Sequence, residues 1–192
     1  MTTKQIILHE AGELFMERGF QATSTREIAE KAEITQPNLY YHFKTKEDIY
    51  IAVLEELSSE VKETLDHLVD QSTGDLVTDL TYIMNYLRER HPINFSIMSH
   101  DMTYEVSKEN HLHLYRIWQE AYMSPLVHLF NRYMDKEKSE ITAEELARYY
   151  YSAMAPFMQK DNNFHKEVSG EKIVDLFVYG ILDRKDRSEN NE

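Results

Sequence analysis

The chain has 192 residues, enough for one large or two small domains, and its 42% hydrophobic content excludes a wholly disordered protein. The absence of cysteine excludes disulfide frameworks, thiolate metal sites and cysteine nucleophiles. The net charge of −13 disfavours nonspecific binding of polyanions over the whole surface. No apolar run approaches the roughly 20 residues of a membrane-spanning helix, and the first one is too short for a signal peptide, so we expect a cytoplasmic protein.

The charge is distributed unevenly along the chain. Residues 51–192 carry 15 Lys and Arg against 26 Asp and Glu, whereas residues 1–50 carry six against eight. Residues 34–46 contain no carboxylate at all. An anionic partner would therefore meet the least repulsion at this segment.

Apolar residues recur with a helical period from the beginning of the chain. Ile7, Ala11 and Leu14 share one face of a first helix, which Gly19 is expected to end in a left-handed conformation. Low contents of glycine and proline also disfavour a loop-rich β fold. The chain is therefore expected to begin with an amphipathic helix.

Two short helices are predicted next. Ser24 and Glu27 have the spacing of a capping box, which would begin the first of them. Thr35 is an apt N-cap for the second, with Pro37 in its first turn and an end near Phe43. Two short helices behind a longer one have the outline of a helix-turn-helix.

The remainder of the chain is predicted to be helical as well. A long amphipathic helix is expected from Lys46 to about Asp70, and the later ones are expected at about 75–91, 93–104, 108–135, 142–162 and 169–184. Pro125 and Pro156 should kink their helices, and residues 183–192 should fray. The fold class is thus all-α, with a three-helix helix-turn-helix domain at 1–45 and a helical bundle at 46–192.

Residues 25–47 resemble the DNA-binding segment of the TetR/AcrR family of bacterial transcriptional regulators. The most specific part is Leu39-Tyr40-x-His42-Phe43-x-x-Lys46-Glu47, within a resemblance that covers about residues 5–50. Glu33 departs from it, since the family usually has a turn glycine there; either the turn is less left-handed, or Glu33 is strained. The resemblance implies a homodimeric repressor that binds double-stranded operator DNA and responds to a small-molecule effector.

The beginning of the second short helix carries side chains suited to base recognition. Gln36 and Asn38 can each form a bidentate pair with adenine, and the Thr35 hydroxyl can donate or accept. The Pro37 ring is suited to a thymine methyl group. These small and polar side chains fit the N-terminal end of a recognition helix in the major groove.

Other side chains are suited to the DNA backbone. Those further along the helix would contact phosphates and fix the register: Tyr40, Tyr41, His42 and Lys46. Thr25 and Arg26 could hold a phosphate at the start of the preceding helix. The resemblance implies DNA contact at each of these matched positions. Leu39 and Phe43 should be buried, and burial of the Tyr40 ring with a wet hydroxyl is an alternative.

The second domain is rich in aromatic residues and methionine, which could line an apolar cavity. The resemblance implies such an effector pocket. The candidate wall residues are Phe95, Met98, Trp118, Tyr122 and Met154. Because this domain is acidic and aromatic rings attract cations, we expect an apolar or cationic effector rather than a phosphorylated metabolite.

The last predicted helix is a candidate dimer interface. Its apolar side carries Ile173, Leu176, Phe177, Gly180 and Ile181, and Gly180 would allow close backbone approach. The alternative is a helix that packs in the core of its own subunit.

Three other interpretations of the sequence are alternatives to a DNA-binding regulator. A metal site is disfavoured, because His111 and His113 point about 200° apart on a helix, and the Glu105, Glu109 and His113 face is better explained as solvated. An all-helical enzyme or small-molecule-binding protein with a vestigial helix-turn-helix would need a binding or catalytic motif, and the sequence suggests no catalytic residue, metal or cofactor. A protein-interaction adaptor predicts scrambled polar residues at 35–42, where the side chains suit DNA.

Overall fold

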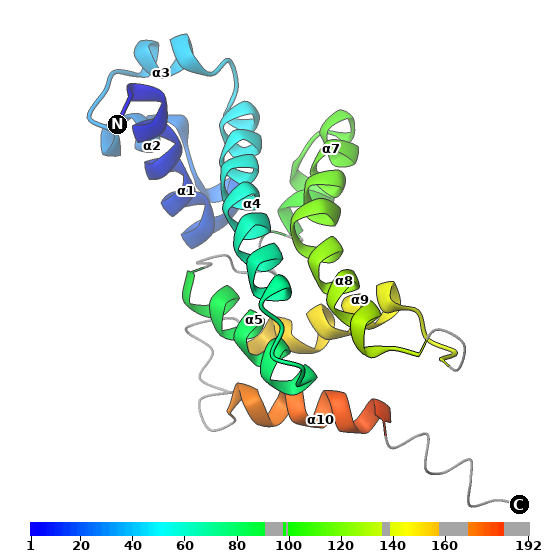
Figure 1. Cartoon of the computed structure of the whole chain (residues 1–192). Coiled ribbons are helices and arrows are strands. Elements are labelled where there is room, and N and C mark those ends of the chain that lie inside the picture. The colour runs from blue at the N-terminus through cyan, green and yellow to red at the C-terminus, as the bar shows by residue number, and fades with distance from the viewer. Residues whose placement is uncertain (91–97, 99, 136–138, 158–168, 183–192) are drawn as a thin grey trace, which may run out of the picture. The chain divides into compact units, whose positions relative to one another are not determined.

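The computed structural model describes residues 1–90, 98, 100–135, 139–157 and 169–182. Throughout these ranges the regular structure is helical and no strand occurs, which confirms the all-α class. The elements in Figure 1 are α1 (Thr3–Ala22), α2 (Thr25–Lys31), α3 (Gln36–His42), α4 (Lys46–Asp70), α5 (Leu76–Arg90), η1 (Asp101–Glu105), α7 (Lys108–Trp118), η2 (Gln119–Met123), α8 (Ser124–Tyr133), α9 (Ala143–Met154), η3 (Ala155–Phe157) and α10 (Gly170–Leu182). Among them, no helix is both long and apolar enough to cross a membrane.

The chain packs into two compact units. The first unit comprises residues 1–63 and 92–122, and the second comprises residues 64–91 and 123–192. The chain passes from one unit to the other within α4 and within η2. These units follow packing, and the functional division between residues 45 and 46 stays a prediction.

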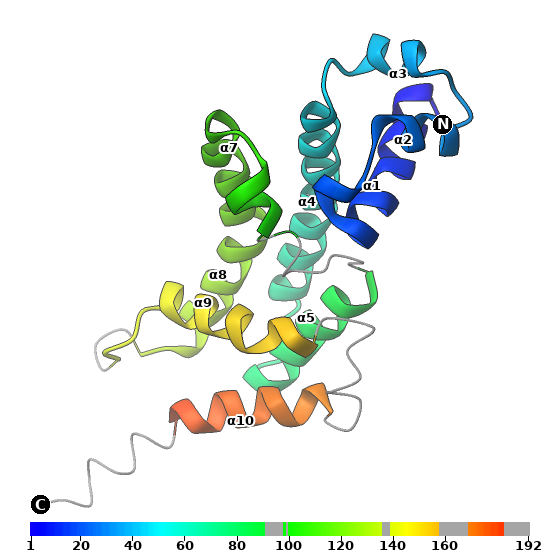
Figure 2. The same ribbon diagram turned by 180° about the vertical axis from the view of Figure 1, so that it is seen from behind.

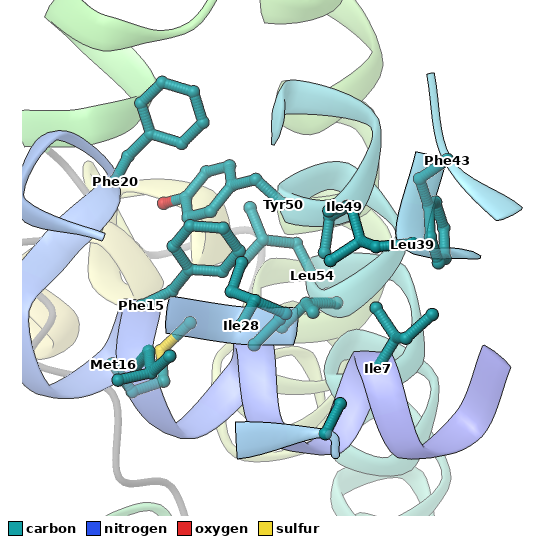
Figure 3. Packing of buried hydrophobic residues seen from close by; sticks show 14 of the residues in the cluster. Ile7, Phe15, Met16, Phe20, Ile28, Leu39, Phe43, Ile49, Tyr50 and Leu54 are labelled. Carbon is teal, nitrogen blue, oxygen red and sulfur yellow. The ribbon is translucent and has the colours of Figure 1, made fainter. Parts of the chain in front are cut away.

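The core of the first unit lies between α1, α2, α3 and the beginning of α4 (Figure 3). Ile7, Ile28 and Leu39 are fully buried in it. The Tyr50 ring contacts the rings of Phe15 and Phe20, with centroids 5.0 and 5.2 Å away. Each fully buried side chain of this size contributes about 1.5–3 kcal/mol, so the inner faces of the short helices are firmly held.

Local sequence patterns determine where the short helices begin. The predicted capping box forms at α2, where the Ser24 hydroxyl accepts from the Glu27 amide and the Glu27 carboxylate accepts from the Ser24 amide. Thr35 caps α3 by accepting from the Asn38 amide at 3.4 Å. Gly19 has the expected positive φ of 83°, yet it kinks α1 and one further turn follows to Ala22.

The turn between α2 and α3 contains a left-handed residue. Glu33 has φ = 54°, the one positive φ of a residue other than glycine in the described ranges. Of the two alternatives, the strained Glu33 is therefore correct, because a side chain at a left-handed residue costs about 1–2 kcal/mol relative to glycine. The sequence keeps the turn geometry despite that strain.

In the second unit, α10 packs along α5 and α8 along α9 (Figures 1 and 2). The buried Tyr150 of α9 donates its hydroxyl hydrogen bond to the Leu80 carbonyl of α5 at 2.7 Å. Its ring also meets the Phe177 ring of α10 at 5.8 Å between centroids. One tyrosine therefore connects three helices.

A carboxylate organises the turn between α4 and α5. Asp79 is buried, and it accepts hydrogen bonds from the Ser72 hydroxyl (2.6 Å), the Thr73 amide (2.9 Å) and hydroxyl (2.8 Å), and the Tyr133 hydroxyl (2.7 Å). Burial alone would raise the Asp79 pKa, but these hydrogen bonds together lower it below its ordinary value. The cluster fixes the turn against α8.

Both predicted proline kinks coincide with changes of helix type. The expected helix at 108–135 consists of α7, the π-helical η2 and α8, with Pro125 as the second residue of α8. A wider turn accommodates the missing proline amide and the ring that crowds the preceding turn. α9 gives way at Met154 to the 3-10 turn η3, which contains Pro156. The expected extensions at 93–97, 158–162 and 183–184 lie outside the described residues.

Candidate DNA-binding site

The outer face of α3 is polar and accessible. Thr35, Gln36, Pro37 and Asn38 are all exposed, whereas Leu39 is buried in the core of the first unit, as Figure 3 shows. Within the described residues, neither the Gln36 nor the Asn38 side chain has a hydrogen-bond partner. Both amides are therefore available to a ligand at the N-terminal end of a short, firmly anchored helix.

The structure brings Thr25 and Tyr40 together from different helices. Thr25 Oγ1 and Tyr40 Oη lie 3.0 Å apart, which joins the beginning of α2 to α3. Tyr40 is 47% exposed, so the alternative of a buried ring is wrong. The two hydroxyls can bind one phosphate oxygen from both sides.

The end of α3 presents a second aromatic group. Tyr41 is 85% exposed, and its ring meets the His42 ring edge-on at 5.3 Å between centroids. His42 itself is half-buried. Tyr41 is thus the most accessible aromatic residue of the predicted DNA contacts.

Arg26 has a partner on the surface. Its Nε donates to Glu30 Oε1 at 2.9 Å, and this hydrogen bond together with the Glu30 charge raises the pKa of Arg26. Both side chains are largely exposed, and such pairs are weak in water. The guanidinium can therefore exchange Glu30 for a phosphate.

Lys46 has an internal role that the sequence interpretation missed. Its ammonium donates to the carbonyls of Phe20 at 2.7 Å and Thr23 at 3.0 Å, and it lies 4.2 Å from the centroid of the Phe20 ring. Desolvation lowers the pKa of Lys46, against the opposing charges of Asp101 and Glu105. Two of its three donors are thus used inside the subunit, and its predicted phosphate contact relies on the third.

The predicted effector residues fall in different parts of the chain. Met98, Trp118 and Tyr122 belong to the first unit and Met154 to the second, while Phe95 lies outside the described residues. Trp118 is half-buried and the other three described side chains are buried. Their role in effector binding stays a prediction.

The predicted dimer residues on α10 do not all face outward. Phe177 contacts Tyr150 of its own subunit, Ile173 is half-buried and Gly180 is exposed. The side chain of Ile181 lies outside the described residues. The large exposed apolar side chains of α10 are Leu176 (72%), which lies on the predicted side, and Tyr179 (53%), which sequence reasoning did not single out.

His113 of α7 contacts α4, whereas a ring nitrogen of His111 is buried. His113 Nε2 lies 2.7 Å from Glu55 Oε1, and His111 Nε2 is buried without a partner in the described part of the chain. The same part contains no cluster of three or more side chains suited to a metal ion.

Part of the sequence matches a family of known proteins. Residues 7–53 match the family described as bacterial regulatory proteins, tetR family. The transcriptional regulator QacR of Staphylococcus aureus is 48% identical over 54 residues, 28% of this chain and 29% of QacR. The regulator YvkB of Bacillus subtilis is 36% identical over 87 residues, 45% of this chain and 44% of YvkB. The sequence similarity thus covers less than half of either relative.

Solved structures extend the likeness of fold to nearly the whole chain. FadR of Bacillus halodurans, a fatty acid degradation regulator, has a TM-score of 0.69 at 15% identity and covers 94% of this chain and 95% of FadR. The Bacillus subtilis FadR, solved in complex with stearoyl-CoA, has a TM-score of 0.68 at 14% identity and covers 92% and 98%. The matched relatives are transcriptional regulators rather than enzymes, and the exposed polar face of α3 lies within the matched segment. Residues 7–53 are therefore similar to the tetR family of bacterial regulatory proteins, and nearly the whole chain shares the fold of solved regulators.

Proposed function

We propose that the chain is a cytoplasmic, homodimeric repressor that releases its operator when a small molecule binds. Residues 1–45 bind the DNA, and residues 46–192 bind the effector and the second subunit. The two unpaired amides on the outer face of α3, Gln36 and Asn38, carry this proposal. A helix whose underside is buried and whose outer face offers free amides is suited to the major groove.

The proposed mechanism is a change in the spacing of two recognition helices. A dimer presents two copies of α3, and these must lie about one helical turn of DNA apart, ~34–36 Å. α4 follows α3 after three residues and extends to Asp70, so its direction governs that spacing. An effector that favours a different direction of α4 would shift the population away from the DNA-binding state.

The proposal predicts two classes of DNA-contact variant. Gln36→Ala and Asn38→Ala should each lose roughly 1–3 kcal/mol at particular base pairs, because they remove base contacts. Tyr40→Phe and Tyr41→Phe should weaken binding to all sequences equally, because they remove phosphate contacts. Affinities would be measured on an operator selected from random DNA, on its single-base variants and on a scrambled duplex.

The matched control for these variants is Gln71→Ala, an exposed glutamine in the second unit, which should leave affinity unchanged. Equal losses for both classes on selected and scrambled DNA would contradict the assigned roles. A selection that enriches no sequence would overturn the proposed function itself. A reporter promoter carrying the selected operator then distinguishes a repressor from an activator.

The effector class is a separate part of the proposal. The acidic second domain and its aromatic side chains favour an apolar or cationic ligand. The structural relative from Bacillus subtilis was solved with stearoyl-CoA, whose phosphates make it the informative competitor. Tetraphenylphosphonium, an apolar cation, and stearoyl-CoA therefore represent the two alternatives.

We expect tetraphenylphosphonium to raise the melting temperature of the DNA-free protein and to weaken operator binding roughly 5–150-fold. The operator should weaken the binding of tetraphenylphosphonium by the same factor. Tetramethylammonium, which has the charge without the apolar surface, should do neither. Calorimetric titration would provide the affinities. Tight binding of stearoyl-CoA, with release of the operator, would contradict the predicted effector class and leave the DNA-binding proposal intact.

A further inference from the structure

The first unit joins the DNA-binding helices to a segment far along the chain. Residues 100–122 pack with residues 1–63 rather than with the rest of the predicted effector domain. Buried apolar side chains such as Val106 and Leu114 join this segment to the core, and charged side chains add hydrogen bonds. Asp101, Lys46 and Glu47 each reach another element of this unit.

Asp101 holds the last turn of α1. It is 4% exposed, and its Oδ2 accepts from the Phe20 amide at 2.8 Å and from the Tyr50 hydroxyl at 3.4 Å. These partners lie 81 and 51 residues away in the sequence. Because Gly19 breaks the helical conformation just before Phe20, that amide takes its acceptor from a side chain. The carboxylate therefore fixes the kink of α1 to η1.

Lys46 binds the other side of the same turn. Its ammonium donates to the carbonyls of Phe20 and Thr23, so the amide and the carbonyl of Phe20 both bond to side chains. The Asp101 and Lys46 charges interact favourably. The end of α1, the beginning of α4 and η1 thus meet at one residue, Phe20.

Glu47, the residue after Lys46 in the first turn of α4, connects this helix to α7. Its Oε1 accepts from the Ser107 amide at 3.0 Å, the Ser107 hydroxyl at 2.6 Å and the Asn110 side-chain amide at 2.7 Å. Ser107 is the N-cap of α7 and makes no side-chain capping bond of its own. Glu47 therefore supplies the cap from another helix, where its negative charge also suits the helix dipole.

We propose that Asp101 and Glu47 are positioning residues that couple the DNA-binding helices to residues 101–110. Asp101 acts through Phe20, and Glu47 acts through the cap of α7. A movement of residues 101–110 must then either move the end of α1 and the beginning of α4 or break these bonds. By reciprocity, operator binding must restrain residues 101–110. The inference rests on the proposed operator binding and adds the side chains that transmit it.

Hydrogen exchange with and without operator DNA tests the coupling directly. In the wild-type protein, the operator should slow amide exchange in α3, which it contacts, and also in residues 101–110. Asp101→Leu and Glu47→Met remove the acceptors at similar volume, so they should abolish the second effect and keep the first. Operator affinity should fall roughly 5–150-fold.

The conservative variants separate positioning from general stability. Asp101→Asn and Glu47→Gln retain an acceptor for the Phe20 and Ser107 amides, so each should retain protection of residues 101–110. Glu56→Met, at an exposed position of α4, should behave as wild type. Should Asp101→Leu fail to fold, Glu47→Met tests the same coupling at a less buried position.

Protection of residues 101–110 that is unchanged in Glu47→Met and Asp101→Leu would overturn the coupling. Protection of α3 alone in the wild-type protein would also overturn the coupling. Absence of protection even in α3 would instead overturn the proposed function, so the two failures are distinguishable.

Discussion

Replacing Leu176 and Tyr179 of α10 together by Asp should dissociate the proposed homodimer and lower operator affinity about 100-fold or more. Both side chains are exposed apolar groups on one helix, and buried charges would oppose association there. Two linked half-sites gain about 10²–10⁴ in avidity over one, so a monomer loses that factor. Sedimentation measures the mass, and titration of the selected operator measures the affinity.

Leu176 and Tyr179 are better targets for this test than Phe177, which was predicted from the sequence to lie in the interface. Phe177 contacts Tyr150 inside its own subunit, so its replacement would also damage the core of the second unit. The matched control is Tyr104→Asp with Leu112→Asp, two exposed apolar residues of the first unit. A Leu176 and Tyr179 variant that sediments as a dimer of unchanged strength would locate the interface elsewhere.

Asp79→Ala should destabilise the second unit by about 3 kcal/mol, because four donors lose a buried charged acceptor together. The control Asp70→Ala removes an exposed partner of Arg132 and should cost no more than about 1 kcal/mol. Urea unfolding followed by circular dichroism provides both free energies. Equal small losses would mean that the cluster contributes no more than a surface ion pair.

The pH dependence of this difference follows from the lowered pKa of Asp79. A carboxyl whose folded-state pKa lies below its unfolded value, about 3.9, binds protons more readily when unfolded. Its stabilisation is therefore complete well above that value and is lost as the pH falls through the folded-state pKa. The difference between wild type and Asp79→Ala should be constant above about pH 5 and shrink below about pH 4. A difference that grows on acidification would contradict the assignment.

Local sequence patterns predicted the short helices well. The capping box of Ser24 and Glu27 and the Thr35 cap depend on neighbours within four residues. The positive φ of Gly19 follows equally from the steric freedom of glycine. Such features are determined locally, so a single sequence suffices to find them.

Long-range contacts were beyond the same reasoning. The Lys46 bonds to Phe20 and Thr23 span more than 20 residues, and the acceptor of the Phe20 amide lies 81 residues away at Asp101. α10 offered a different difficulty, because apolar residues such as Leu176 and Tyr179 also lie on its exposed surface, so helical periodicity alone does not separate its inner face from its outer one. In each case the missing information is tertiary packing.

The fluorescence of Trp118 allows the unfolding of the first unit to be followed separately. It is the single tryptophan of the chain, and it lies at the end of α7 in the first unit. Its emission therefore reports on the unit that contains the DNA-binding helices, whereas far-ultraviolet ellipticity reports on the helices of both. Coincident transitions by the two methods would mean that the units unfold as one cooperative body, and separate transitions would assign a stability to each.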